Sequence, residues 1–226
     1  MKRASIISDE AKAVNFREVC MGSIAPNTLY RSSHPIKDNQ QEKALSLLAS
    51  KARIAAVLNL CDTNSEIVSK AIFSPWYNKL LKNNQVIALG WGFNCTSENF
   101  KKKFKKGLQF IINTEGPWLI HCFAGVDRTG FISMVLEAFM GATLDEINND
   151  YLLSFNSHYD SAIFGVVNKT DSQVVMQLQS AMSDSQAIND QNLQQVAESY
   201  LREKISLSAE ELELLRNKLS VRPCPD

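Results

Sequence analysis

Residues 118–136 read WLIHCFAGVDRTGFISMVL. An apolar run at 118–120 is followed by a ten-residue loop at 121–130 and then by an amphipathic run at 131–136. This order predicts a buried strand, a tight loop and a helix. The first N–H groups of a helix have no partner within it and lie at the positive end of its dipole, so the loop is predicted to bind an anion.

The loop places a thiol and a guanidinium six positions apart. Cys122 begins it, where positive potential favours the thiolate, and Arg128 is a planar group that binds two phosphate oxygens at once. Gly125 permits the backbone shape that turns successive N–H groups inward. We therefore predict phosphoryl transfer through a cysteinyl-phosphate, with Cys122 as the nucleophile. The residues expected to bind the phosphate are Phe123, Ala124, Gly125, Val126, Asp127 and Arg128.

The string at 121–130 resembles the signature loop of cysteine-dependent protein tyrosine phosphatases. A Cys and an Arg alone at this spacing would be weak evidence, but the preceding His121 and the following Thr129-Gly130 make the match specific. A sulfurtransferase of the rhodanese type also carries a loop cysteine, but typically places its Arg one position nearer. A buried cysteine beside an ordinary helix start is the remaining alternative, and it leaves the polar neighbours of the thiol unexplained.

Four flanking segments resemble one group of that family, the atypical dual-specificity phosphatases of bacteria and fungi that include the mycobacterial secreted tyrosine phosphatase B. They read NFRE at 15–18, LYRS at 29–32, DYLLS at 150–154 and LLR at 214–216. The resemblance implies hydrolysis of phosphotyrosine, often of phosphoserine or phosphothreonine, and in some members of phosphoinositides. It also implies a helical C-terminal part that packs beside the active site.

Two positions depart from the pattern of that group. Val126 stands where relatives usually have Lys, and its neutral side chain is expected to weaken the binding of highly anionic head groups. Residues 59–61 read Asn-Leu-Cys where Asp-Leu-Arg is common, so the polar contacts of those side chains cannot be carried over.

Strands alternate with helices as far as residue 142. The expected strands are 15–19, 29–32, 54–60, 86–89 and 118–122, and the expected helices are 38–50, 97–113 and 128–140. This predicts an α/β fold with a mostly parallel central sheet flanked by helices, and it places the loop at the carboxyl end of a central strand. Later helices are expected at 171–182, 192–205 and 208–219. We interpret 1–226 as a single phosphatase domain with an α/β core at 14–142 and a helical extension at 143–226.

Supporting roles are expected for other residues of the loop. His121 should hydrogen-bond the loop backbone and hold the thiolate form rather than act as a base. Thr129 should donate its hydroxyl to the sulfur, the alternative being an ordinary first-turn residue. Arg128 should bind phosphate and stabilise charge in the transition state, the alternative being a surface pair with Asp127.

The general acid is harder to assign from the sequence. Cleavage of an ester needs a proton on the leaving oxygen. Most tyrosine phosphatases carry this acid on a loop before the last strand, yet residues 85–117 contain no Asp. Asp127 matches the position that the resemblance suggests, and the alternative is an N-cap for the following helix. Asp62, at the end of an expected strand, is the second choice.

The composition restricts partners and compartment. The formal net charge is zero over 226 residues, so no nucleic-acid partner is expected. The lysines of 101–106 are interpreted as the solvated face of a helix, with a phosphoinositide or membrane surface as the less favoured alternative. No run is suited to a signal peptide or a membrane span, so we expect a cytoplasmic protein or one exported without a cleaved signal. The oligomeric state stays open.

Five cysteines lie at positions 20, 61, 95, 122 and 224, and no pair has CxxC spacing. Neither a disulfide framework nor a zinc site is predicted, and no metal or cofactor is expected. Cys61 and Cys95 are interpreted as buried inert thiols, with a role as resolving thiols for Cys122 as the alternative.

The leading hypothesis is a phosphatase that acts on phosphotyrosine in a phosphorylated protein or on a small phosphomonoester, with phosphoserine and phosphothreonine as further substrates. Because Val126 removes a charge, aryl phosphates are expected to be better substrates than multiply phosphorylated inositols. The alternatives are an inositol-phosphate or phosphoinositide phosphatase and, less favoured, a phosphate-binding pseudophosphatase.

Overall fold

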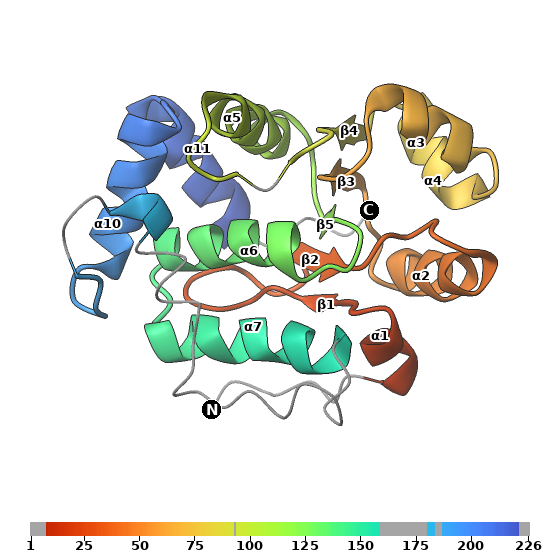
Figure 1. Ribbon diagram of the computed structural model, residues 1–226, viewed down its shortest axis with the longest axis horizontal. Coiled ribbons are helices and arrows are strands. Elements are labelled where there is room, and N and C mark those ends of the chain that lie inside the picture. Colours follow the sequence, from red (N-terminus) through yellow and green to blue (C-terminus); the bar gives the residue numbers. More distant parts are fainter. Residues whose placement is uncertain (1–7, 93, 159–179, 184–186, 222–226) are drawn as a thin grey trace.

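The computed structural model describes residues 8–92, 94–158, 180–183 and 187–221 (Figure 1). Within these residues a five-stranded sheet has the strand order β1-β2-β5-β3-β4. The strands are β1 Arg17–Glu18, β2 Leu29–Ser32, β3 Ala56–Asn59, β4 Val86–Ala88 and β5 Trp118–His121. β1 is antiparallel to β2 and the other neighbouring pairs are parallel, which confirms the predicted α/β fold with a mostly parallel sheet.

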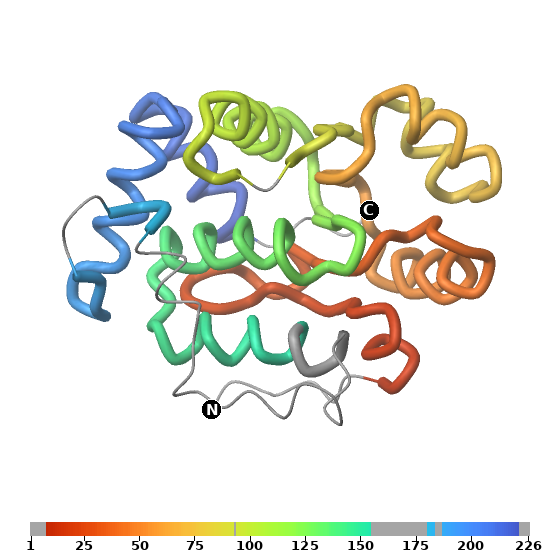
Figure 2. Tube along the Cα trace, in the orientation of Figure 1, coloured from red at the N-terminus to blue at the C-terminus, as the bar shows by residue number. Residues whose placement is uncertain are grey.

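Helices cover both faces of the sheet, as the chain trace also shows (Figure 2). One face carries α5 Glu98–Asn113, α6 Asp127–Phe139, α7 Leu144–His158, α10 Leu193–Ser199, the π-helical η2 Tyr200–Lys204 and α11 Ala209–Ser220. The other carries α1 Asp9–Ala13, α2 Asn39–Lys51, α3 Asn64–Ala71 and α4 Pro75–Lys82. None of the described helices combines the length and the apolar character needed to cross a membrane.

The side chains of β5 alternate between the two layers of helices that cover the sheet. Trp118 and Ile120 pack into the core that includes α5 and α6, whereas Leu119 packs into the core that includes α2, α3 and α4. All three side chains are almost completely buried. Successive side chains of a strand point to opposite faces, so a strand covered on both faces reads as a continuous apolar run. β5 is therefore the buried central strand that the sequence predicted.

The register of the sheet places the carboxyl ends of the parallel strands β2, β5 and β3 side by side. Ser32 of β2 and Asn59 of β3 both pair with His121 of β5. The segments that follow these residues consequently emerge at the same edge of the sheet, on either side of the loop that follows β5. Ligands of open α/β sheets bind at this edge.

The later helices extend the layer around α6. α7 and α10 pack against α6, and α11 packs against α5. Capping boxes open α7 at Thr143 and α11 at Ser208. The helix expected at 192–205 is formed by α10 and η2, while the one expected at 171–182 lies largely outside the described residues.

Residues 61–85 contain two helices that the sequence analysis left unassigned. α3 begins with a capping box formed by Thr63 and Glu66, and α4 begins with Ser74 as its cap and Pro75 in its first turn. Each has eight residues, which is too short for a periodic apolar pattern to stand out. Their starting signals were nevertheless present in the sequence.

Candidate active site

The phosphate loop, residues 121–130, leaves β5 at the centre of the sheet and leads into α6. Cys122 is 2% exposed, and its Sγ accepts a hydrogen bond from the Gly125 N–H at 3.3 Å. Gly125 has a φ of +75°, and a Cβ there would lie 2.5 Å from the carbonyl oxygen of Ser32. Only glycine fits this turn. A hydrogen bond to the sulfur favours the thiolate over the thiol.

The start of α6 supplies free backbone donors. Val126 occupies the N-cap position and no side chain caps the helix. The first N–H groups of α6 are therefore available to an anion beside Cys122. The Val126 side chain itself is fully buried in the apolar core. The Val126 side chain is not among the residues that line the cavity described below, and the expectation drawn from the missing Lys at this position stays a prediction.

Arg128 lies in the first turn of α6, and its guanidinium is held by the backbone of the segment that follows β4. Its Nη1 donates a hydrogen bond to the carbonyl oxygen of Trp91 at 2.9 Å. Trp91 follows β4, is 2% exposed and stacks on Phe100 with ring centroids 4.2 Å apart. The backbone of a buried residue thus fixes one end of the guanidinium, and its other N–H groups remain for a ligand.

A cavity of about 540 Å³ opens beside the loop. Its lining combines cations, one carboxylate, a thiol and apolar side chains. The lining residues are His34, Ile36, Lys37, Cys61, Asp62, Lys70, Phe73, Phe123 and Arg128. Phe123 forms part of the rim, is 51% exposed and has Lys37 Nζ 4.5 Å from its ring centroid. We call this space the active-site cavity.

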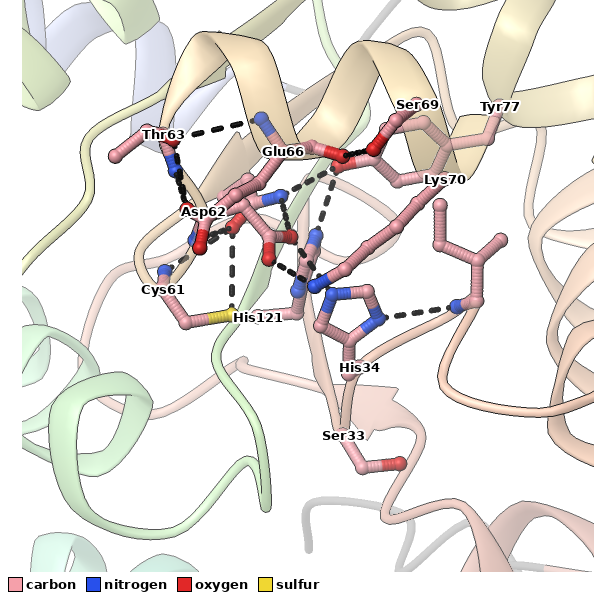
Figure 3. A network of polar contacts seen from close by, with 12 residues as sticks. Ser33, His34, Cys61, Asp62, Thr63, Glu66, Ser69, Lys70, Tyr77 and His121 are labelled. Carbon is pink, nitrogen blue, oxygen red and sulfur yellow. Dashed lines mark hydrogen bonds and ion pairs between the residues drawn. The ribbon is translucent and has the colours of Figure 1, made fainter. Parts of the chain in front are cut away.

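Asp62 is held ionised in the wall of the cavity (Figure 3). Its carboxylate accepts hydrogen bonds from His34 Nε2 at 2.7 Å, Asn59 Nδ2 at 2.7 Å and Lys70 Nζ at 2.5 Å. Because His34 Nδ1 accepts from the Ile36 N–H at 3.1 Å, the ring proton lies on Nε2, facing Asp62. Burial raises the pKa of Asp62, but the hydrogen bonds from His34, Asn59 and Lys70 outweigh it and hold the pKa well below the usual range.

His121 belongs to the same network as a neutral ring. Its Nε2 lies 2.9 Å from the hydroxyl of Tyr77, which also accepts from Asn59 Nδ2 at 3.2 Å. A hydrogen bond therefore joins Tyr77 to His121. Burial, and then the neighbouring His34, lower the pKa of His121 well below its usual value. An uncharged His121 orients the end of β5 but supplies no positive charge to the thiolate.

The two carboxyls considered as general acid lie in different surroundings. Asp62 lines the active-site cavity, whereas Asp127 is exposed in the first turn of α6 and does not line it. A carboxylate at that position is favoured by the helix dipole. Val126, not Asp127, is the N-cap, so the capping alternative for Asp127 is also wrong.

Thr129 differs from expectation, whereas Cys61 agrees with its interpretation as an inert thiol. Thr129 is fully buried, and within the described residues its Oγ1 has no hydrogen-bond partner, so the expected bond to the sulfur is not made. Cys61 is half-buried and its Sγ donates to Asn59 Oδ1 at 3.4 Å. Burial, together with Asp62, raises the pKa of Cys61 to about 12, which keeps it as a thiol.

One set of side chains in the described part of the chain has the spacing of a metal site. Donor atoms of His34, Cys61 and His121 lie within 4.8 Å of one another. A metal there would have to displace Asp62 from His34, Tyr77 from His121 and a proton from Cys61. The observed hydrogen bonds instead make these residues parts of one polar network.

Sequence reasoning missed most of the cavity wall. His34 and Lys37 follow β2, and Lys70 lies on α3, so only the tertiary fold brings them to Arg128. One signal was available, because polar residues that follow neighbouring parallel strands meet at the same edge of a sheet. Applied to His34 as well as Asp62, that rule would have paired the two.

Comparison with known proteins identifies the family. A model of the tyrosine phosphatase family matches residues 10–221. No curated protein matches the sequence. The chain is similar in structure to the core catalytic domain of the PP-IP phosphatase SIW14 from S. cerevisiae in complex with citrate, with 20% identity, 89% of this chain and 94% of that chain covered, and a TM-score of 0.46. A second SIW14 catalytic core matches with 21% identity, coverage of 67% and 88%, and a TM-score of 0.43. Because the family model spans most of its length, this chain belongs to the tyrosine phosphatase family and is a cysteine-based phosphatase, a phosphoric monoester hydrolase.

Proposed function

We propose that Cys122 is the nucleophile and that Arg128 binds the transferred phosphate. The observation that carries this is the hydrogen bond from the Gly125 N–H to Sγ at the uncapped start of α6, with Arg128 of the same loop in the wall of the adjoining cavity. The thiolate forms a P–S bond while the P–O bond breaks, and the leaving group takes the electron pair. Water then attacks the phosphorus, breaks the P–S bond and releases phosphate. Arg128 and the loop N–H groups stabilise the equatorial oxygens.

The chemistry of the cavity favours leaving groups that need no proton. Asp62 is the only carboxyl among the described residues that line the cavity, and its three donors keep it ionised. Asp127 is exposed in the first turn of α6 and is not among the lining residues. Without a protonated carboxyl, an acidic leaving oxygen is expelled far more readily than an alkoxide. Aryl phosphates and phosphoanhydrides meet this condition, and alkyl monoesters such as phosphoserine do not.

The charge of the cavity favours a substrate with several phosphates. Lys37, Lys70 and Arg128 face one carboxylate, Asp62. A concave wall with excess positive charge raises the local concentration of polyanions. The substrate that we propose is a small, multiply phosphorylated molecule of the inositol-phosphate class, cleaved at a phosphoanhydride. This differs from the preference for aryl phosphates expected from the neutral side chain of Val126, because it rests on the cations that line the cavity.

Phosphotyrosine is the second candidate, and a separate observation favours it. Phe73 and Phe123 both line the cavity and are 74% and 51% exposed. Exposed aromatic rings at the rim can pack against the ring of a phosphotyrosine. The likeness of four sequence segments to the group of the mycobacterial phosphatase B supports this candidate and remains a prediction.

The experiment compares kcat/KM for a phosphotyrosine peptide, inositol hexakisphosphate and an inositol phosphate that carries a diphosphate. Wild type should turn over the peptide and the diphosphate far faster than inositol hexakisphosphate, whose phosphates are all alkyl monoesters. Cys122→Ser should abolish turnover of the peptide and of the diphosphate, and Lys37→Gln should slow the diphosphate about tenfold more than the peptide, less so at high salt. Equal effects of Lys37→Gln on all substrates would refute the polyanion assignment. Appreciable turnover by Cys122→Ser would refute the mechanism.

A further inference from the structure

Two successive peptide units of the phosphate loop are held with their carbonyls on the same side. The Ala124 carbonyl accepts a hydrogen bond from Asn15 Nδ2 at 3.3 Å. The Gly125 carbonyl accepts from Asn15 Nδ2 at 3.1 Å and from Arg31 Nη2 at 2.9 Å. In a planar trans peptide the N–H points away from the carbonyl. The N–H groups of Gly125 and Val126 therefore point to the opposite side.

That opposite side is where the sulfur lies. The Gly125 N–H, which shares a peptide unit with the Ala124 carbonyl, donates to Cys122 Sγ at 3.3 Å. Gly125 tolerates many backbone conformations, so nothing intrinsic to the loop prevents these peptide units from rotating. A rotated unit would present a carbonyl oxygen to the thiolate and to a bound phosphate. Donors behind the loop are needed to exclude that arrangement.

The donors behind the loop are themselves fixed by a buried ion cluster. The Asp150 carboxylate pairs with Arg17 Nε at 2.8 Å and with Arg31 Nη1. Arg17 also donates to Asn15 Oδ1, which accepts a further bond from Ser154 Oγ at 3.2 Å. These contacts occupy the oxygen of the Asn15 amide, so its Nδ2 must face the loop. The cluster joins the three segments 15–18, 29–32 and 150–154, which the proposed chemistry leaves without a role.

The cluster also places positive charge behind the loop. Arg31 is fully buried, and Arg17 and Asp150 are 7% and 2% exposed. The neighbouring Glu137 is fully buried, and burial followed by Asp150 raises its pKa well above the usual range, so it is neutral. Two guanidiniums therefore face a single carboxylate. On the cavity side, the titratable and charged groups near the loop are Arg128, His121, Cys61, His34, Asp62, Lys37 and Lys70.

We infer that Asn15 and Arg31, fixed by Arg17 and Asp150, are positioning residues that set the acidity of the Cys122 thiol and the affinity of the loop for phosphate. They act by holding the Ala124 and Gly125 carbonyls back, so that the amides converge on the sulfur and the phosphate. The inference rests on the proposed role of Cys122 as the nucleophile. By this inference, the buried Arg17–Arg31–Asp150 cluster affects the Cys122 thiol and phosphate binding, which lie on the other side of the loop.

Asn15→Gly is the sharpest test, because it removes both hydrogen bonds that Asn15 Nδ2 donates to the loop without adding charge. Asn15 has a φ of +51°, which glycine adopts freely. The pH dependence of Cys122 alkylation by iodoacetamide reports the thiol, and inhibition by vanadate reports the oxyanion site. In Asn15→Gly the midpoint of alkylation should rise by about one pH unit and the vanadate affinity should fall about tenfold. Asn15→Asp keeps the acceptor for Arg17 and should shift both in the same direction.

Arg216→Lys is the matched control. Its guanidinium also donates to a backbone carbonyl, that of Phe139 at 3.2 Å, and to a carboxylate, that of Glu198 at 2.9 Å. Arg216 lies on α11, so this variant should keep the wild-type alkylation profile and vanadate affinity.

An unchanged alkylation profile and unchanged vanadate affinity in folded Asn15→Gly would overturn the inference. Should that variant not fold, the same results in Asn15→Asp would overturn it. Turnover by Cys122→Ser refutes the proposed function instead, so the two failures are distinguishable.

Discussion

Asp127→Asn should leave catalysis almost unchanged, because Asp127 is exposed in the first turn of α6 and does not line the active-site cavity. A carboxylate at a helix N-terminus stabilises the fold by about 0.3–1 kcal/mol. Losing that charge should lower stability by this amount and kcat/KM by no more than about threefold. A general acid contributes about 10²–10⁴ in rate, or roughly 2.7–5.4 kcal/mol of barrier. The two outcomes are far enough apart to be separated by experiment.

The assay is a series of aryl phosphates of rising leaving-group pKa, extended to an alkyl phosphate. Wild type should show a steep fall in kcat/KM along the series, and Asp127→Asn should follow the same line. Asp62→Asn serves as the comparison from inside the cavity. It loses the negative charge and one of the two oxygens that accept from His34, Asn59 and Lys70, all of which are buried or charged, and should unfold about 2–3 kcal/mol more easily. A selective loss of the poor leaving groups in Asp127→Asn, by a hundredfold or more, would refute the reasoning.

Three further outcomes are expected. Gly125→Ala should lower kcat/KM by at least about tenfold, because a left-handed alanine costs about 1–2 kcal/mol and its Cβ would meet the Ser32 carbonyl; steady-state kinetics on the folded variant checks this. Tyr77→Phe should lower the free energy of unfolding by about 1–3 kcal/mol, measured in urea, because it leaves His121 Nε2 buried without its hydrogen-bond partner. Because the pKa of Asp62 is lower in the folded protein than in the unfolded chain, its stabilising contribution is complete at higher pH and is lost on acidification below about pH 4. Urea unfolding at several pH values should show a weaker acid dependence in Asp62→Asn than in wild type.

The sheet and the phosphate loop could be predicted because their signals are local. The run 118–120 is apolar at every position, and the Cys122 to Arg128 spacing lies within one loop. Both follow from rules about a few successive residues. The prediction for α5 succeeded for the same reason, since a sixteen-residue helix repeats its apolar face several times.

The direction of the Val126 side chain could not be predicted from the sequence. A loop has no period, so adjacent residues of the phosphate loop alternate between cavity and core without a pattern. Phe123 emerges at the rim, and Val126 turns into the core. The meeting of Lys37 and Lys70 was also out of reach, because it depends on how α2 and α3 pack against the sheet rather than on any local motif.

The position of the phosphate loop between the segments that follow β2 and β3 has a consequence for how substrate preference evolves. The phosphate loop is constrained on every side, by the Ser32 carbonyl over Gly125 and by the core around Val126, so few of its positions tolerate change. The segments after β2 and β3 supply Lys37 and, through α3, Lys70 and Phe73, which line the cavity outside the loop. After a gene duplication, substitutions in these two segments would therefore change substrate preference while the phosphate loop stays the same. For the same reason, an inhibitor that binds the loop and also contacts those two segments would be selective for one member of such a group of related enzymes.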